Sequence, residues 1–534
     1  MSSVIDGTNP EPTNSRKRTA LCLLWLALAS GVGLTVPVIA GRPLVLDEHG
    51  SYWIAGADNP GTLLERSLDY SATLPVSFVI ERAFLDAWGK SPIVFRASSV
   101  LCYLAAIALV YLFGKELRGP LVGGLAACVF AWHPEVIDNV RVARPYGATV
   151  MFAGLAFWLT ARWWKRPDRL LLGLAWATAN SLLVWTHLLN SLAVVPQLVA
   201  LLVVKPRQFT ADRRAAGGLL LALVLFGCSL LPLMPFVFRL WETRQVLNFA
   251  PSSAPWEKIP TLWWVGLPLG WLAGWLVSLV RQLPHDDERS PQVARDRRGM
   301  WMLAICALLP LIVATAASAA TLLNLANERY QISYAIPAAC LIAALLSYRR
   351  TVAASCFGLL TALAASWLAA GAAPWESQLN NQSAQDWKSI AEVVASEGRD
   401  GEALFVQGGL AESVLVLTSF EDPMLMDYIA CRLGRFYLAG DHRRFALPPF
   451  WDLVRDGRRF SISEPQSYFA EMFLAIGASR TPSLWVASIT DTDAGRAIER
   501  IELMLQRTGF REEAKHTFDS AVLMHYVHPH ERDR

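Results

Sequence analysis

Long apolar runs constrain the fold of this chain more than any other feature of its sequence. The first, residues 19–40, follows a polar N-terminus that ends in Arg16, Lys17 and Arg18. It is longer than the roughly 7–15 apolar residues of a signal peptide. An apolar helix of about 20 residues can cross a bilayer because it satisfies its own backbone hydrogen bonds there. Further runs lie at residues 98–114, 121–134, 145–161, 169–186, 188–204, 216–238, 260–280, 300–320, 331–347 and 352–370. The sequence therefore predicts a polytopic α-helical membrane protein with about eleven spans.

The composition agrees with a membrane protein and argues against several other classes. Hydrophobic residues make up 54% of the chain and charged residues 17%, against about 25% charged residues in soluble domains. The net charge of +3 is too small to indicate nucleic-acid binding. The eight cysteines form no CxxC pair, and all except Cys431 lie in or beside apolar runs. Neither a disulfide framework nor a zinc site is expected.

The positions of lysine and arginine predict which ends of the spans face the cytoplasm, where basic residues are enriched. They concentrate in alternate connections, at 115–118, 162–169, 205–214, 281–298 and 349–350. Residues 1–18 are then a cytoplasmic tail. The outward connections are 41–97, 135–144, the turn near His187, 239–259 and 321–330. With about eleven spans, the end of the chain is also outside. This predicts a multi-pass protein of the cell inner (plasma) membrane.

The last part of the chain differs in character from the rest. Residues 19–373 are predicted to form the transmembrane part, with 41–97 as its first outer loop. Residues 374–534 are rich in charge and alternate between helix-like and strand-like patterns. We expect a small α/β domain on the periplasmic or extracellular face. Its predicted elements are a helix at 384–396, strands at 403–407 and 483–489, a helix at 493–507 and a strand at 521–527.

Two adjacent carboxylates, Asp47 and Glu48, stand just beyond the first span. A carboxylate at the membrane edge can accept a proton from a substrate and act as a general base. Acidic pairs are also common at the start of solvated loops. From this pair alone, that structural interpretation is favoured.

Two arginines, Arg141 and Arg144, lie in an outer connection and break the charge pattern of the other loops. If the stretch is helical, residues three apart share one face. Such a pair suits a phosphate, which arginine grips with two parallel hydrogen bonds. Contact with lipid headgroups, or a salt bridge to Glu135 or Asp138, explains the pattern equally well.

Two further groups of polar residues lie at outer ends of spans. Arg329 and Tyr330 stand beside Tyr334 at the start of a late span, where arginine and tyrosine also serve as interfacial anchors. His187 and Asn190 lie at an apolar outer turn, where a lone histidine is more often structural than catalytic. All of these residues map to the same side of the membrane, where a negatively charged, lipid-linked substrate would meet them.

The order of these features resembles that of a known family, the GT-C superfamily of polytopic glycosyltransferases. The likeness is to its bacterial protein mannosyltransferase-like and aminoarabinose-transferase-like branch, the glycosyltransferase 39 or RgtA/B/C/D-like group. The residues that carry it are the Asp47-Glu48 pair, the Gly-Lys-Glu-Leu-Arg-Gly loop at 114–119 and the Arg-Val-Ala-Arg-Pro-Tyr motif at 141–146. Glu-Arg-Tyr at 328–330 and Gln-Asp-Trp-Lys at 385–388 follow in the same order. The resemblance covers residues 19–370 and is looser beyond them.

The resemblance implies a sugar donor carried on a polyprenyl phosphate and an acceptor hydroxyl at the outer face of the membrane. Asp47 matches the catalytic acid of the family's first-loop motif and would act as general base, with Glu48 beside it, in a reaction that inverts the anomeric centre. Arg141 and Arg144, with Arg329, would stabilise the departing phosphate.

Several further residues are expected to bind the substrate, Asp138 among them by the same resemblance. Asp138 would orient the acceptor, with Glu135 as its competitor, and the remaining substrate-binding residues would be Tyr146, His187 and Tyr330. The acceptor class stays open among glycan, lipid and protein, and membrane lipids surround the spans. Some GT-C enzymes use a divalent metal, so the resemblance allows one, although the sequence offers no clear ligand set.

Two other functions agree with the sequence alone. A secondary transporter would carry ionisable residues at mid-membrane, whereas the charged residues here lie at span ends. A membrane scaffold would use the outer domain to bind a partner, and its loop charges would be incidental.

Overall fold

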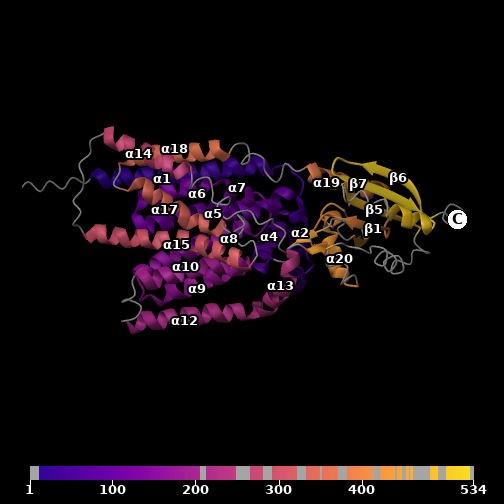
Figure 1. The fold of residues 1–534 in the computed structure, drawn as a ribbon, viewed down its shortest axis with the longest axis horizontal. Helices are drawn as coiled ribbons and strands as arrows, with labels where there is room; N and C mark the ends of the chain where they lie inside the picture. The colour runs from indigo at the N-terminus through magenta and orange to yellow at the C-terminus, as the bar shows by residue number, and fades with distance from the viewer. Residues whose placement is uncertain are drawn as a thin grey trace, which may run out of the picture.

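A computed structural model of the chain describes the transmembrane helices and most of the C-terminal sheet. The described residues are 11–71, 73–204, 212–247, 265–280, 291–321, 332–348, 351–370, 382–410, 412–413, 421–438, 442–447, 453–455, 458–460, 482–490 and 501–528. Their helices run side by side along the long axis of the molecule, and a β-sheet lies at one end of the bundle (Figure 1).

The bundle is built from the apolar runs, and every predicted span overlaps a helix. Four helical segments in the described residues are long and apolar enough to cross a membrane: Ser15–Ile39, Pro92–Arg118, Arg213–Trp241 and Val352–Ala369. A fifth candidate is a pair of helices bent by 62° between Ala131 and Pro134. The chain is a multi-pass membrane protein, while the count of about eleven spans stays a prediction. The helices are α1 (Glu11–Ile39), α5 (Pro92–Arg118), α6 (Pro120–Ala131), α7 (Pro134–Val140), α8 (Tyr146–Lys165), α9 (Leu170–Val184), α10 (Ser191–Val204), α12 (Arg213–Leu230), α13 (Met234–Leu247), α14 (Leu267–Val280), α15 (Pro291–Thr321), α17 (Ala335–Ser347) and α18 (Val352–Ala370).

The first outer connection, 41–97, is itself mainly helical. It contains α2 (Leu46–Ala55), α3 (Pro60–Tyr70) and α4 (Pro75–Trp88). Proline at the first position of α3 and α4 supplies a φ angle already suited to a helix. The Asn59 side chain caps α3 by accepting the backbone N–H of Thr62 at 2.9 Å. These short helices pack on one another at the end of the bundle that lies beside the β-sheet (Figure 1).

The C-terminal part contains a five-stranded sheet in the order β2-β1-β5-β7-β6. Strands β2 (Arg443–Ala446), β1 (Ala403–Gln407) and β5 (Ser483–Ile489) are parallel. Strands β7 (Ala521–Val527) and β6 (Arg511–Thr517) complete it in antiparallel pairing. The predicted strands at 403–407, 483–489 and 521–527 are confirmed at those bounds, and the predicted helix at 384–396 is α19 (Gln382–Glu397). The predicted helix at 493–507 begins outside the described residues. A separate hairpin joins β3 (Leu453–Arg455) to β4 (Arg458–Phe460).

The C-terminal part packs against one end of the bundle through α20 (Pro423–Ile429) and the residues that follow it. The Trp53 indole N–H in α2 donates to Asp427 Oδ2 at 2.7 Å. The backbone N–H of Leu44 donates to the Tyr437 hydroxyl at 2.8 Å. Apolar side chains from both parts, including Trp53 and Ile429, belong to one buried cluster. Helix α2 is therefore held between the bundle and the sheet.

Close packing of α5 on α8 depends on a glycine. A Cβ atom added to Gly147 would lie 2.4 Å from Ser99 Oγ and 2.5 Å from the Ser99 carbonyl oxygen. Gly147→Ala should therefore destabilise the protein by about 1–3 kcal/mol, because α8 must move away from α5. Gly33→Ala in α1 is the matched control, since nothing lies within 4 Å of its added Cβ. Thermal unfolding in detergent should show a lower midpoint for Gly147→Ala only. Equal midpoints would contradict the close approach.

Candidate functional site

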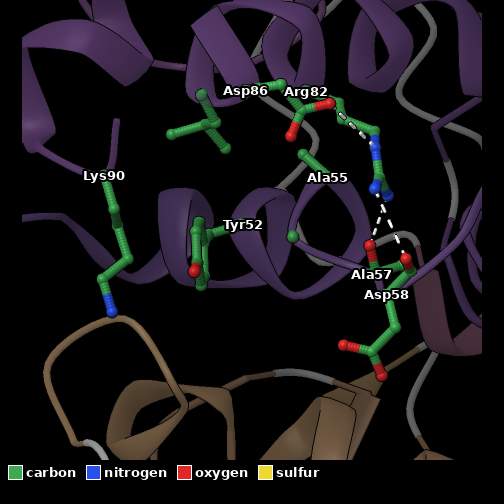
Figure 2. Close-up of a pocket in the computed structure, with 9 residues that line it drawn as sticks. Tyr52, Ala55, Ala57, Asp58, Arg82, Asp86 and Lys90 are labelled. Carbon is green, nitrogen blue, oxygen red and sulfur yellow. Dashed lines mark hydrogen bonds and ion pairs between the residues drawn. The ribbon is translucent and has the colours of Figure 1, made fainter. Parts of the chain in front are cut away.

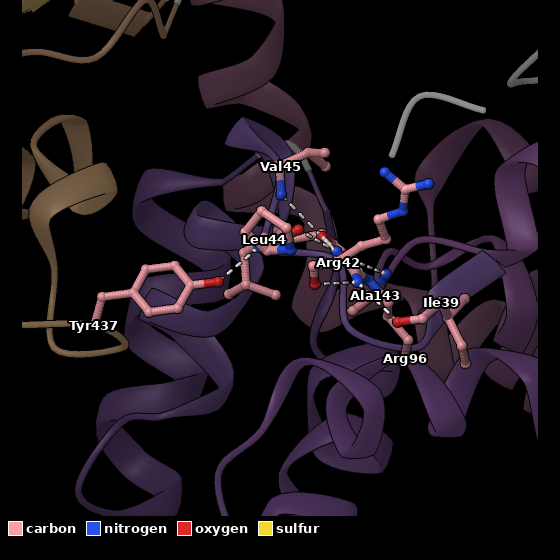
Figure 3. Close-up of polar contacts among 9 residues, drawn as sticks. Ile39, Arg42, Leu44, Val45, Arg96, Ala143 and Tyr437 are labelled. Atoms are coloured by element: carbon pink, nitrogen blue, oxygen red, sulfur yellow. Dashed lines mark hydrogen bonds and ion pairs between the residues drawn. The ribbon is translucent and has the colours of Figure 1, made fainter. Parts of the chain in front are cut away.

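A buried ion pair between Glu48 and Arg96 organises the end of the bundle that meets the C-terminal part. Both side chains have 0% exposure, and Arg96 Nη2 lies 2.5 Å from Glu48 Oε2. Arg96 Nε also donates to Glu48 Oε1 at 2.8 Å. The remaining Arg96 hydrogens bind the carbonyl oxygens of the chain that leaves α1, at Ile39, Arg42 and Pro43. Figure 3 shows these bonds converging on one guanidinium group.

The same carboxylate joins α2 to the turn that carries Arg141 and Arg144. Glu48 Oε1 accepts the backbone N–H of Ala143 at 2.8 Å, and Oε2 accepts that of Val45 at 3.0 Å. The second bond caps the N-terminus of α2. The Glu48 carboxylate is therefore occupied by structural hydrogen bonds. These bonds place Asp47 and Arg144 close to one another.

Asp47 and Arg144 form an ion pair at the edge of this buried network. Arg144 Nη2 lies 3.7 Å from Asp47 Oδ2, and the two side chains are 23% and 36% exposed, respectively. Both therefore remain accessible to a substrate. Burial by itself lowers the pKa of Arg144, but the carboxylate of Asp47 and other acidic neighbours outweigh it, so its pKa lies above the usual value. Arg144 is thus a permanent cation beside a carboxylate.

Arg141 does not join Arg144 as the sequence suggested. Residues 141–145 form turns rather than a helix, so the two arginines share no helical face. Arg141 is 1% exposed. Its Nε and Nη2 donate to the carbonyl oxygen of Leu34 in α1, at 3.1 and 2.6 Å. The condition for a shared helix face is therefore not met: Arg141 anchors the turn to α1, and Arg144 pairs with Asp47. Their role toward a phosphate stays a prediction.

The two histidines near the site are neutral at physiological pH. Burial, followed by the positive charge of Arg144, lowers the pKa of His187 to about 4. Its Nδ1 accepts the backbone N–H of Leu189 at 3.3 Å, so the neutral ring carries its proton on Nε2. Burial and Arg432 lower the pKa of His49 to about 3. Neither histidine therefore supplies a cation for a phosphate, whereas Arg144 does.

The other predicted residues lie at different distances from this pair. Tyr146 is buried at the start of α8 and interacts electrostatically with Arg144. Asp138 is partly exposed in α7 and lies within electrostatic reach of Arg141. Glu135, its competitor, pairs with His133 Nδ1 at 2.7 Å. Arg329 and Tyr330 lie outside the described residues.

Three residues that the sequence did not single out interact electrostatically with Arg144, and Arg432 of the C-terminal part interacts with Asp47. Glu81 in α4 is 2% exposed and interacts electrostatically with Arg144. Glu412 and Tyr428, from the C-terminal part, interact with both Arg144 and Asp47. The Tyr428 hydroxyl donates to Glu412 Oε1 at 3.3 Å. For Glu81, the available signal was a lone carboxylate on the apolar face of a proline-led helix, whereas the other two carry no local signal.

Metal binding has no clear ligand set in the part of the chain that the structure describes. No group of three or more His, Cys, Asp or Glu side chains there is arranged to hold an ion. A divalent metal stays a hypothesis that the resemblance allows.

A hollow of about 220 Å³ lies beside α2 and α4 but contains none of the predicted site residues. Figure 2 shows Tyr52 and Lys90 on its walls, with Arg82 turned toward Asp58 and Asp86. Its cations are already engaged: Arg82 donates to the Ala57 carbonyl oxygen and pairs with Asp86 at 3.3 Å, and Lys90 donates to the carbonyl oxygen of Arg435 at 2.9 Å. The accessible pair of Asp47 and Arg144 is the stronger candidate for chemistry.

Comparison with solved structures shows the fold. No protein-family model matches the chain, and no curated protein matches its sequence. The structure is similar to ArnT from Cupriavidus metallidurans in the apo state, with a TM-score of 0.55, 11% identity and coverage of 95% of this chain and 98% of that one. ArnT bound to undecaprenyl phosphate gives a TM-score of 0.53 at 10% identity, with coverage of 96% and 97%. An oligosaccharyltransferase of Archaeoglobus fulgidus tethered to an acceptor peptide gives 0.49 at 11% identity, with coverage of 89% and 69%. ArnT is a GT-C glycosyltransferase, so the GT-C resemblance drawn from the sequence is confirmed at the level of the fold.

The buried ion pair predicts a large effect of a single substitution. Arg96→Met leaves the Glu48 carboxylate buried without its cation, which should cost about 3–5 kcal/mol of stability. Lys388→Met removes an exposed helical pair, in which the side chains are 40% and 62% exposed, and should change stability by less than about 1 kcal/mol. Thermal unfolding of both variants in one detergent measures the difference. A midpoint for Arg96→Met equal to that of Lys388→Met would show that the pair does not organise this region.

Proposed function

We propose that this chain, which has the GT-C fold, is a membrane glycosyltransferase that moves a sugar from a polyprenyl-phosphate donor to an acceptor hydroxyl. The observation that carries the proposal is the accessible carboxylate–arginine pair, Asp47 and Arg144, at the rim of a buried network. A general base and a fixed cation are the two groups that such a transfer needs. The similar ArnT structure with bound undecaprenyl phosphate supports a lipid-phosphate donor.

The chemistry is a single displacement at the anomeric carbon. The acceptor hydroxyl oxygen forms a bond to that carbon while the bond from the carbon to the phosphate oxygen breaks, and its electron pair leaves with the lipid phosphate. Asp47 takes the hydroxyl proton as general base. Attack from the face opposite the leaving group inverts the anomeric centre.

Arg144 meets the negative charge that grows on the departing phosphate. A cation held in place before the reaction needs no reorganisation in the transition state, and this makes it effective. Glu48 and Arg141 are positioning residues in this proposal, because they fix the positions of Asp47 and Arg144. Asp138, Tyr146 and His187 belong to the substrate-binding wall in this proposal, and Arg329 and Tyr330 keep their predicted place in it.

The proposed orientation places the site outside the cytoplasm. Residues 1–18 lie in the cytoplasm, 19–373 form the transmembrane part, and 374–534 form an α/β domain on the periplasmic or extracellular side of the inner membrane. The charge pattern of the connecting loops supports this orientation. The sugar, taken here as a hexosyl or pentosyl unit, would then be delivered to a glycan, lipid or protein acceptor of the envelope.

Asp47→Asn tests the proposed base. The change keeps the size of the side chain but removes its ability to take a proton, so transfer should fall by about 10²–10⁴-fold. Transfer of radiolabel from a polyprenyl-phosphate sugar to envelope acceptors measures the rate. Asp86→Asn, an exposed carboxylate of α4 with a side chain 66% exposed, should transfer normally. Near-normal turnover by Asp47→Asn would remove this residue from catalysis, and a transporter or scaffold would transfer no label at all.

Reporter fusions test the orientation. A reporter enzyme that is active only outside the cytoplasm should be active when fused after Ala373 and silent when fused after Arg214, because the basic loop at 205–214 is retained in the cytoplasm. Immunoblots of both fusions control for expression. The reverse pattern would move the proposed site to the cytoplasmic face.

A further inference from the structure

Glu81 is a buried carboxyl group without a hydrogen-bond partner among the described residues. It lies in α4, on the inward face that also carries the buried Ser77 and Phe78. The residue is 2% exposed, and its Oε2 atom makes no hydrogen bond. Leaving such a group unsatisfied is destabilising, because the hydrogen bonds that it made to water are not replaced. Native proteins carry few such groups, so this one calls for an explanation.

A second unsatisfied group lies in the same part of the molecule. The Nε atom of Arg144 is buried and makes no hydrogen bond within the described chain. Of the charged groups that act on Glu81, Arg144 has the largest electrostatic effect. Two unsatisfied polar groups within electrostatic reach of one another, one of them on the proposed phosphate-binding residue, are the pattern expected where a ligand supplies the missing partners.

The surroundings of Glu81 favour its protonated form. Burial raises its pKa well above the usual value, the positive charge of Arg144 opposes this, and the carboxylate of Glu48 in α2 adds to it. The other titratable groups near it are the Cys102 thiol in α5 and His187, whose loop hydrogen-bonds the start of α4 through the carbonyl oxygens of 185 and 186. Among these groups Arg144 is the cation, and it already pairs with Asp47.

We propose that Glu81 is a binding residue of the transfer site, whose neutral carboxyl group donates a hydrogen bond to a phosphate oxygen of the lipid-phosphate substrate held by Arg144. This inference rests on the proposed function and deepens it. A carboxylate in this position would repel the phosphate, whereas a carboxylic acid satisfies it, and hydrogen bonds to a charged group are among the stronger ones. The proton on Glu81 and the bound phosphate then stabilise each other reciprocally.

The sign of the pH dependence follows from this linkage. Affinity for the phosphate is fully present at a pH below the pKa of Glu81 and declines as the pH rises through it, because the carboxylate then faces an anion. Glutamine keeps a hydrogen-bond donor at every pH. The affinity of wild type divided by that of Glu81→Gln should therefore be close to one in acid and fall as the pH rises. The ratio cancels the ionisation of the ligand itself.

Binding of undecaprenyl phosphate to the purified full-length chain, measured in detergent from pH 6 to pH 9.5, tests the proposal. At pH 6, Glu81→Gln should bind within about twofold of wild type, and Glu81→Leu should bind about tenfold or more weakly, as expected for loss of a hydrogen bond to a charged group. Arg144→Ala should also lose affinity. Asp86→Asn, on the same helix and exposed, is the control that should leave binding unchanged.

The outcomes separate this inference from the proposed function. If wild type does not bind undecaprenyl phosphate, the proposed function falls and this inference falls with it. If wild type binds and Glu81→Leu binds equally well, Glu81 makes no contact with the phosphate. If Glu81→Gln binds as weakly as Glu81→Leu at pH 6, a carboxylate rather than a carboxylic acid is needed. Should Glu81→Leu not fold, the pH dependence of the ratio for Glu81→Gln still decides, and a constant ratio overturns the proposal.

Discussion

The pairing of Glu48 with Arg96 is the interaction on which the junction between the helix bundle and the C-terminal part depends. Two opposite charges with no exposure are tolerated only when their hydrogen-bonding capacity is satisfied, since removing each from water is costly. Here the carboxylate binds Arg96 and two backbone N–H groups, and the guanidinium binds three carbonyl oxygens besides. The consequence is geometric. Asp47 and Arg144 are each one residue away from an atom of this network, and so their positions follow from it.

The site is assembled from segments that lie far apart along the chain. Asp47 comes from α2, Glu81 from α4, Arg144 from the turn after α7, and Glu412 and Tyr428 from the C-terminal part. No single element contains a complete set of groups. The helices of the 41–97 connection supply two of these groups, Asp47 and Glu81, and α2 lies between the bundle and the C-terminal sheet (Figure 1).

The sequence predicted those features that depend on local patterns. Apolar runs marked the helices of the bundle, and short, mostly apolar runs marked three strands of the sheet at their observed bounds, because burial of these elements requires such runs. Within the site, Asp47 and Arg144 stood out by their position at the ends of spans. Arg141 misled, since its helical spacing from Arg144 has no meaning in a turn. The sequence could not predict the roles of Glu412 and Tyr428, because their electrostatic interaction with Arg144 joins residues hundreds of positions apart.

The hydrogen bonds from α2 and α3 to the C-terminal part also set an order of events during synthesis of the chain. The partner of Trp53 is Asp427, 374 residues later, and the partner of Tyr70 is Asp422, 352 residues later. A ribosome therefore delivers most of the helices to the membrane before these partners exist. Until then, α2 lacks the surface that covers it, and Asp47 has no fixed neighbours on that side. The C-terminal residues that complete the site are the last to be synthesised. A truncated or unfinished chain would therefore carry the proposed catalytic pair without the residues that surround it in the folded protein.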